Sequence, residues 1–566
     1  MELQINGKQI EAQPGKTLLD LTRELGFDRE KLSERPLAAK LAGQVFNLNY
    51  IPVRVTDADP DRPSIRRAMA ASGGVVQLLY YDDPAGKGVY TRTAQFIMFL
   101  AMHRLWPEAR AIMECTIGGA LFVRVPGVES FDASKLKQEI QNLVAQDIPL
   151  IRRRMPVEEA IREYEAQGSR DKAKLLTIRK KPYFDYYRCG DFFDYYYGEV
   201  APSTGYLQVW DVLPAQDGFW FLFPDNNRPD TVAEYRELPK FLRANMQVRE
   251  WGKLMQCRNV SALNDMVQDG SIRELIRVNE ALHEKQYSAA ADMVCDRDAK
   301  MVMLAGPSSS GKTTSAHRLA TQLRVHGKRP ILISLDDYYR DRDTILPGPD
   351  GKVDLEHINT IDTDLFAHHV AMLMKGETVY LPRFNFVSGK REQSDRALTM
   401  DESTVFVVEG LHALNPILLP QGIDENKVFR MYVTPMLPLN LDDHNRIPTS
   451  MLRLLRRIVR DYQTRGASVE HTLSMWDSVR RGEKLWIFPF QENADLIFNS
   501  STLYELSVLK HRIFPLLNAV QPQENCYEDV RGLVKILNYI LECDPEDEIP
   551  PTSVVREFIG GNTFYR

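Results

Sequence analysis

A segment rich in glycine and serine, Gly306–Thr314 (GPSSSGKTT), carries the residue types that bind phosphate groups. Gly306 and Gly311 enclose four residues and are followed by Lys and Thr, which is the spacing of a phosphate-binding loop. The two glycines permit backbone angles that aim successive amide N–H groups at phosphate oxygens. Lys312 would bring positive charge to the terminal phosphates, and the Thr313 hydroxyl would ligate magnesium. The sequence therefore predicts an ATP and Mg²⁺ site.

Two elements must position this loop. Residues 301–305 are all apolar and predict a short buried strand, and the apolar spacing over residues 314–326 predicts a helix that ends at Gly327. A chance match is the alternative, but a strand before and a helix after are the context that the motif requires. The expected triphosphate-binding residues are Gly306, Ser308, Ser309, Ser310, Gly311, Lys312, Thr313 and Thr314.

Acidic side chains follow two further apolar segments. Residues 331–336 predict a strand that ends at Asp336, and residues 405–408 predict another that ends at Glu409. In an open parallel sheet, ligands bind beyond the carboxyl ends of the strands. Asp336 is therefore the candidate general base for an attacking hydroxyl, and Glu409 the candidate Mg²⁺ ligand. A helix cap or an ion-pair partner is the alternative for Asp336, and a cap of the next helix is the alternative for Glu409. We expect Asp337 to be structural.

An arginine-rich helix is predicted over MLRLLRRIVRDYQTRG. Arginines 453, 456, 457 and 460 share one face at helical spacing. A solvated surface is the usual explanation of such a run, but a net acidic chain favours anion contact here. One cis-supplied arginine can contribute roughly 10³-fold to phosphoryl transfer, and such a helix can close over the nucleotide. The candidate catalytic residues are Asp336, Lys312, Arg456, Arg457, Arg460 and Arg465.

The totals limit the class of protein. A length of 566 residues favours roughly two to four domains. The net charge of −6 gives no general attraction to nucleic acid or to anionic membranes. Six scattered cysteines, without a Cys-x-x-Cys pair, favour a reducing compartment. No apolar run reaches ~18 residues and no export signal begins the sequence, so we expect a cytoplasmic protein without membrane contact.

The N-terminal 240 residues predict two α/β modules. Residues 1–85 alternate short strands with one helix over residues 16–25 and resemble the β-grasp TGS domain of threonyl-tRNA synthetases. Residues 86–240 resemble the α+β editing-type domain of the same family, through HRLWPEARAIMECTIGGALF, RRRMPVEEA and GDFFDYYYGEVAPSTGYL. In that family, two His, a Cys and a further His mark the deacylase pocket. Here those positions hold Arg92, Phe96, Tyr196 and Val200, so we expect neither zinc nor deacylase activity.

Aromatic residues gather between positions 183 and 197. They predict core packing, with a stacking platform for a base as the alternative. Residues 241–298 predict a helical connection, with helices over 262–266 and 272–282. Residues 521–566 predict a C-terminal helix at 530–541 and an exposed acidic, proline-rich tail.

Residues 299–520 predict one domain, and roughly residues 299–515 of it resemble the uridine/cytidine kinases, a branch of the phosphate-loop kinases with a doubly wound parallel sheet. The motifs are GPSSSGKTT, LDDYY, DLEHINT, RFNFVSGKR, VVEGLHAL, RLLRRIVRDYQTRG and ENADLIFNS. The resemblance implies that Asp336 is the base and that Thr313 and Glu409 lie beside magnesium. It implies that the arginines from 453 to 465 form a lid. The acceptor residues that it implies are Asp336, Tyr338, Glu356, His357, Phe384, Phe386 and Arg391.

Departures from the family concentrate in the acceptor pocket. Glu356 and Asn359 each replace an Asp, Gly389 replaces a His that contacts the base, and Ala467 replaces an Arg. Three hypotheses therefore remain open. The first is phosphorylation of a nucleoside 5′-hydroxyl, and the second is a sugar or small alcohol acceptor, as in phosphoribulokinases. The third is an RNA- or ribosome-associated regulator whose nucleotide site acts as a switch. An oligomer is compatible with each.

Overall fold

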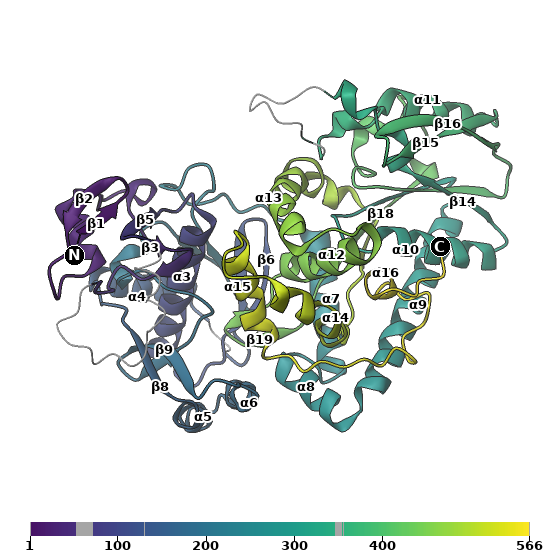
Figure 1. The fold of residues 1–566 in the computed structure, drawn as a ribbon. Helices are drawn as coiled ribbons and strands as arrows, with labels where there is room; N and C mark the ends of the chain where they lie inside the picture. The colour runs from purple at the N-terminus through teal and green to yellow at the C-terminus, as the bar shows by residue number, and fades with distance from the viewer. Residues whose placement is uncertain (1, 53–71, 129–130, 346–353, 355, 565–566) are drawn as a thin grey trace. The chain divides into compact units, whose positions relative to one another are not determined.

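The computed structural model describes residues 2–52, 72–128, 131–345, 354 and 356–564 (Figure 1). These residues belong to two compact units. The N-terminal unit comprises Met1–Leu238 together with Asn440–Arg446, and the C-terminal unit comprises Pro239–Leu439 and Ile447–Arg566. Within the described ranges, no helix combines the length and apolar character needed to cross a membrane.

A five-stranded parallel sheet is the centre of the C-terminal unit. Its order is β14 (Arg329–Ser334), β17 (Thr404–Glu409), β13 (Met301–Ala305), β18 (Val428–Thr434) and β21 (Leu496–Asn499). Because side chains alternate along a strand, Met301 and Met303 of β13 enter one apolar cluster, whereas Val302 and Leu304 enter another. Both faces of the sheet are therefore covered, as the prediction of a doubly wound α/β fold requires.

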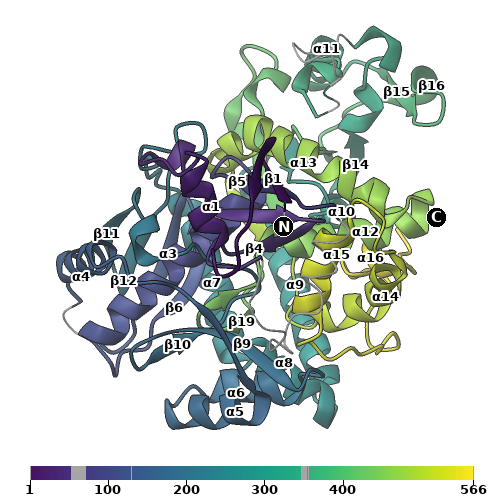
Figure 2. The ribbon, with the colours of Figure 1, turned by 60° about the vertical axis from the view of Figure 1, so that its left-hand side comes forward.

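Helices cover these two faces. The long α9 (Ile272–Asp296) packs with α10 (Lys312–Val325) over one face, and α9 extends well beyond the predicted 272–282. In both views, α11 (Thr363–Met374) lies beside the hairpin of β15 (Val379–Asn385) and β16 (Lys390–Leu398) (Figures 1 and 2). The remaining helices are α7 (Pro239–Leu254), α8 (Val260–Asp269), α12 (Thr449–Arg465), α13 (Val469–Trp486), α14 (Glu505–Ala519), α15 (Tyr527–Leu537) and α16 (Arg556–Ile559).

The N-terminal unit begins with a five-stranded sheet in the order β2-β1-β5-β3-β4, against which α1 packs. The predicted combination of short strands with one helix is confirmed, and α1 lies inside the predicted range 16–25. The bounds are β1 (Glu2–Ile5), β2 (Lys8–Glu11), α1 (Leu18–Glu24), β3 (Ala38–Leu41), β4 (Gln44–Phe46) and β5 (Val75–Leu79). The Thr17 hydroxyl caps α1 by accepting from the Asp20 N–H, which satisfies one of its free amide groups.

The rest of the N-terminal unit up to Leu238 contains two antiparallel sheets. One has the order β11-β12-β7-β6 and the other β10-β9-β8. The elements are α3 (Pro84–Leu105), β6 (Ile112–Ile117), β7 (Ala120–Arg124), α4 (Ala133–Ala145), β8 (Arg152–Pro156), α5 (Val157–Ala166), α6 (Arg170–Thr177), β9 (Tyr183–Cys189), β10 (Phe192–Asp194), β11 (Asp211–Ala215) and β12 (Gly218–Leu222). The helix α3 is buried along most of its length, so it forms the centre of the core.

A hairpin that follows β18 in the chain belongs to the N-terminal unit. It consists of β19 (Asn440–Asp442) and β20 (Asn445–Arg446), which corrects the prediction that residues 299–520 form one continuous domain. Asp442 accepts a hydrogen bond from the Tyr195 hydroxyl at 2.6 Å. Although burial opposes ionisation of Asp194, Lys172 and His444 hold its pKa at about 2. The hairpin is thus anchored by paired buried charges.

The C-terminal segment corrects one prediction. The helix near residues 530–541 exists as α15, but the expectation of an exposed tail is wrong for the residues that follow it. Val554, Val555 and Phe558 are fully buried in the C-terminal unit. The acidic residues before them obscured this short apolar segment, which the overall composition of the tail did not reveal.

Candidate active site

A cavity of about 350 Å³ opens at the carboxyl ends of β13, β14 and β17. The phosphate-binding loop follows β13, and Glu409 is the last residue of β17. Asp336 is the second residue after the end of β14. Lys312, Asp336, Glu356, Glu409 and Arg460 all line the cavity. The parallel sheet therefore gathers residues that lie far apart in the sequence, as its topology predicts.

The loop has the geometry of an anion site. Gly311 adopts φ +82° immediately before α10, so the first amide groups of that helix are directed toward the cavity. In the described part of the chain, the buried hydroxyl groups of Ser309 and Ser310 have no hydrogen-bond partner. Lys312 Nζ contacts only the Pro307 carbonyl among the hydrogen bonds found for its side chain, at 3.2 Å. These unsatisfied donors fit the phosphate groups that the sequence predicts.

Two carboxyl groups face the loop. Burial raises the pKa of Asp336, against the attraction of Lys312 and with added repulsion from Asp337. Burial and the charge of Asp336 raise the pKa of Glu409 to about 7. Burial likewise lowers the pKa of Lys312. Such opposed shifts are characteristic of a site built to bind additional charged groups. Asp337 instead accepts a hydrogen bond from the Phe384 N–H at 3.3 Å, in line with a structural role.

The residues present fit a magnesium ion beside a triphosphate. Thr313 Oγ1 lies 3.5 Å from Glu409 Oε1, and Ser334 Oγ donates to the same carboxylate at 3.2 Å. Within the part of the chain that is described, no cluster of three or more His, Cys, Asp or Glu side chains is placed to hold a metal by itself. Mg²⁺ in phosphate-transfer sites usually takes one or two protein oxygens plus phosphate and water. Thr313 and Glu409 supply that smaller set.

The arginines of α12 divide into two groups. Arg453 is paired with Glu483 and donates to the Ser308 carbonyl, and Arg456 is paired with Glu505 and donates to the Ser309 carbonyl. Both are almost fully buried and support the loop from behind, so the expectation that Arg456 faces the reacting groups is wrong. The arginines of α12 that do line the cavity are Arg457, Arg460 and Arg465.

The acceptor side of the cavity contains only part of the predicted set. Glu356, Phe384 and Phe386 line it, and the two phenylalanine rings lie 5.2 Å apart. Burial raises the pKa of Glu356 to about 7, although Arg457 opposes the shift.

Three predicted acceptor residues do not line the cavity. The Tyr338 hydroxyl is hydrogen-bonded to His369, and Arg391 is paired with Asp362 at 2.8 Å. His357 Nδ1 accepts from the Asn359 N–H, which starts a short helical turn. Each of these three side chains therefore forms a hydrogen bond or an ion pair within the protein and does not line the cavity.

Several lining residues were not predicted. Tyr339 lies next to Tyr338 in the chain, and its hydroxyl is hydrogen-bonded to Asp336, so the short helical turn Leu335–Tyr338 selects the second tyrosine. Glu557 of α16 accepts from the Thr314 hydroxyl at 2.7 Å and from the Thr314 N–H at 3.4 Å. Only the buried apolar residues around Glu557 could have indicated its position.

Arg342 occupies the neighbourhood of Gly389. A Cβ atom at position 389 would lie 2.8 Å from Arg342 Cδ, and Gly389 has φ +69°. The Arg342 N–H donates to the Gly389 carbonyl at 2.9 Å. A larger side chain at position 389 would therefore be strained and obstructed, and the side chain found at this place is that of Arg342.

The four former metal-type positions of the N-terminal unit are filled by packed side chains. Phe96 is fully buried with its ring 6.4 Å from that of Tyr196, and Val200 is also fully buried. Arg92 Nε donates to the Glu199 carbonyl at 2.8 Å. The nearby aromatic residues, including Phe184 and Phe193, are buried in the core, which favours packing over a base-stacking platform.

The N-terminal and C-terminal regions of the chain are similar to different known proteins. The family model "Phosphoribulokinase / Uridine kinase family" matches residues 301–507. A uridine kinase of Vibrio vulnificus is 30% identical over 224 residues, which are 39% of this chain and 96% of that kinase. The N-terminal region matches a threonine–tRNA ligase of Clostridium kluyveri at 27% identity, across 38% of this chain and 31% of the ligase. This chain thus spans less than a third of that relative.

Among solved structures, D-glycerate 3-kinase from Cryptococcus neoformans var. grubii is similar over 47% of this chain and 89% of its own. The sequence identity is 16% and the TM-score 0.20.

Proposed function

Because the chain belongs, through residues 301–507, to the phosphoribulokinase/uridine kinase family, we propose that its C-terminal unit transfers the γ-phosphoryl group of ATP to a nucleoside 5′-hydroxyl. The observation that carries the proposal is the placement of Asp336 in one cavity with Lys312 and the phosphate-binding loop. A panel of nucleosides and sugars, scored for ADP release, tests it. Release with a pyrimidine nucleoside supports the proposal, and release with sugars alone contradicts the nucleoside assignment.

The chemistry follows from the site's own groups. The amide groups of the loop and Lys312 hold the triphosphate and fix its orientation. Asp336 accepts the proton of the acceptor hydroxyl as that oxygen attacks phosphorus, while Tyr339 holds the carboxylate in position. Mg²⁺, held by Thr313 and Glu409, would neutralise phosphate charge when bound.

The arginines of α12 complete the site. Arg457, Arg460 and Arg465 line the cavity, where they would stabilise the negative charge that spreads over the transferring group. Arg457 also donates to the Ser308 hydroxyl at 3.0 Å, which links this helix directly to the loop. The helix thereby supplies positive charge and excludes water from one wall of the cavity.

Acceptor affinity should rise with pH through Glu356. Its raised pKa, about 7, leaves the carboxyl largely protonated at pH 6 and largely ionised at pH 8. In the ionised form both oxygens can accept, one from each hydroxyl group of a ribose, whereas protonation turns one oxygen into a donor. Since apparent affinity scales with the competent fraction, acceptor Kd measured by calorimetry without ATP should fall about tenfold over this range. Glu356→Gln should remove the pH dependence, and a persisting slope in that variant would assign it to another group.

Glu557 should weaken nucleotide binding. Its carboxylate occupies the Thr314 N–H and hydroxyl at the start of α10, where an anionic phosphate would compete for the same donors. Glu557→Gln should therefore tighten ATP binding by about 1 kcal/mol, or roughly fivefold in Kd. Glu548→Gln removes the same charge from the same segment but at the ion pair with Arg277, and should leave the Kd unchanged. Equal effects in both variants would contradict a local role.

A second acceptor class has its own observation. Arg342 lines the cavity beside Gly389, where it adds a fixed positive charge on the acceptor side. A guanidinium group suits a carboxylate or phosphate on the acceptor as well as a base carbonyl. A sugar or small alcohol that carries such an anion is therefore the alternative acceptor. Arg342→Met should then raise the KM for the anionic acceptor more than for uridine.

A further inference from the structure

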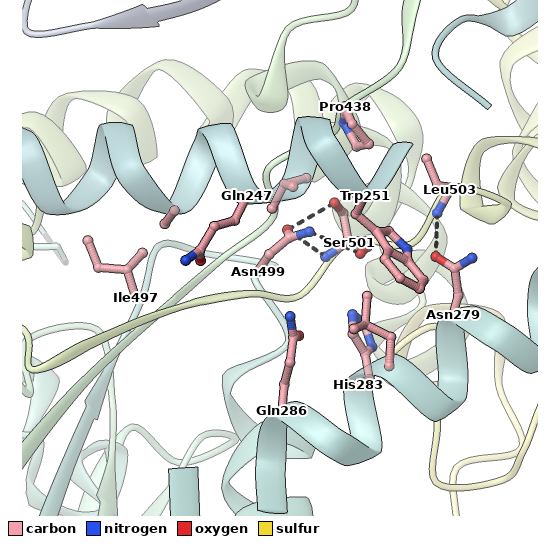
Figure 3. Close-up of a pocket in the computed structure, with 13 residues that line it drawn as sticks. Gln247, Trp251, Asn279, His283, Gln286, Pro438, Ile497, Asn499, Ser501 and Leu503 are labelled. Atoms are coloured by element: carbon pink, nitrogen blue, oxygen red, sulfur yellow. Dashed lines mark hydrogen bonds between the residues drawn. The ribbon is translucent and has the colours of Figure 1, made fainter. Parts of the chain in front are cut away.

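A second cavity, of about 220 Å³, lies in the C-terminal unit between α7, α9 and the segment that follows β21 (Figure 3). It shares no lining residue with the candidate active site. Side chains from the two helices, including Trp251, His283 and Gln286, point toward one another across it (Figure 3). Its volume is several times the roughly 30 Å³ that one water molecule occupies in the liquid, so the space is more than a single hydration site.

Three buried polar atoms at this cavity have no hydrogen-bond partner among the residues that the structure describes: Trp251 Nε1, His283 Nδ1 and Gln286 Oε1. The His283 side chain is only 3% exposed. The neighbouring Asn279, by contrast, is paired, since its side-chain oxygen accepts from the Leu503 N–H at 3.2 Å. A buried unpaired donor or acceptor usually costs about 1–3 kcal/mol. Three such atoms around one cavity therefore point to a ligand that pairs with them.

The three unpaired atoms determine which hydrogen-bond donors and acceptors the ligand needs. Burial lowers the pKa of His283 to about 4, so its ring is neutral near pH 7. A ring hydrogen bond reaches the Ser501 backbone, and because Nδ1 is unpaired, Nε2 is the donor and Nδ1 an acceptor. Trp251 Nε1 supplies a donor and Gln286 Oε1 a second acceptor.

The uncharged lining and the flat ring faces of the cavity restrict the range of possible ligands further. No lining residue of this cavity carries a charge, so an ionic ligand would be desolvated without compensation. The indole and imidazole rings provide flat apolar faces for stacking. We propose that this cavity binds a neutral, planar nitrogen heterocycle of nucleobase size, which accepts from Trp251 and donates to His283 and Gln286.

The floor of this cavity is connected to the phosphate-binding loop. Asn499 and Ser501 line the cavity, and Ser500 between them contacts the loop by donating to the Ser310 carbonyl. The Ser500 carbonyl in turn accepts from Arg456 at 2.9 Å. Filling the cavity should thus fix the position of Ser500, and we expect an occupied cavity to change the KM for ATP about twofold or more.

The test is isothermal titration calorimetry of the full chain with uracil, cytosine, adenine and guanine, each without sugar or phosphate. At least one base should bind, and Gln286→Leu should weaken that base roughly tenfold. Lys285→Leu alters the neighbouring, exposed residue of α9 and should bind as wild type. Trp251→Phe keeps the ring and removes the donor, so it provides a second variant if Gln286→Leu does not fold.

Two results would overturn the proposal. If no base binds at millimolar concentration, the cavity holds only water. If binding survives unchanged in both Gln286→Leu and Trp251→Phe, the bases bind elsewhere, and Glu356→Gln would show whether the candidate active site is responsible. Neither result bears on the proposed phosphoryl transfer, which is measured separately with the wild-type protein.

Discussion

Replacing Asp336 with Asn should lower the rate of phosphoryl transfer about 10³-fold while ATP binding is retained. The amide keeps the size and the hydrogen bond of the side chain but cannot accept the proton of the attacking hydroxyl. Its neutral charge also removes repulsion from Glu409 and from the phosphates, so the Kd for ATP should not rise. Single-turnover rates and nucleotide binding by calorimetry measure the two effects separately.

Asp337→Asn is the matched control for this variant. Asp337 is the adjacent carboxylate, and it accepts a backbone hydrogen bond from Phe384 instead of lining the cavity. It should keep the transfer rate within a few-fold of wild type. Similar losses in both variants would mean that the turn is disturbed as a whole, and full activity of Asp336→Asn would remove the assignment of the base.

Arg456→Met should destabilise the C-terminal unit by about 3–5 kcal/mol, because it leaves Glu505 buried without its partner. Both side chains of this pair are fully buried, and Arg456 also donates to backbone carbonyls of the loop and of Ser500. Urea unfolding followed by fluorescence measures the loss. The variant that removes both charges, Arg456→Met with Glu505→Leu, should recover part of the stability.

Arg460→Met provides the contrast within the same helix. Arg460 lines the cavity and pairs with Asp461 at a partly exposed position, so its removal should leave the unfolding midpoint nearly unchanged. Its transfer rate should instead fall by roughly 10³-fold. A stability loss for Arg460→Met as large as that for Arg456→Met would contradict the division of the arginines into two groups.

The sequence predicted those parts of the site that depend on local patterns. Residues 301–305 are all apolar and form β13, and the glycine spacing placed the phosphate-binding loop between this strand and α10. Asp336 and Glu409 were predicted because acids after parallel strands gather at one edge of the sheet. Each of these inferences needed only neighbouring residues and the topology of a parallel sheet.

Features that depend on distant partners were missed. Helical spacing placed Arg456 and Arg460 on one face, but only the fold brings Glu505 to the former. Glu557 reaches Thr314 across 243 positions of the chain, and nothing local marks it. The hairpin Asn440–Arg446 belongs to the N-terminal unit through Asp194 and Tyr195, which are equally distant in sequence. Buried ion pairs and hydrogen bonds between such distant residues leave no periodic pattern in the sequence from which they could be predicted.

The most direct test of the central claim is ³¹P NMR of the full chain with ATP, Mg²⁺ and a pooled set of nucleosides. Our account predicts a new phosphomonoester resonance that grows at the rate at which the γ-phosphate of ATP disappears. Inorganic phosphate as the sole product, or ATP that stays intact with every acceptor, would contradict phosphoryl transfer to an alcohol and favour a nucleotide switch.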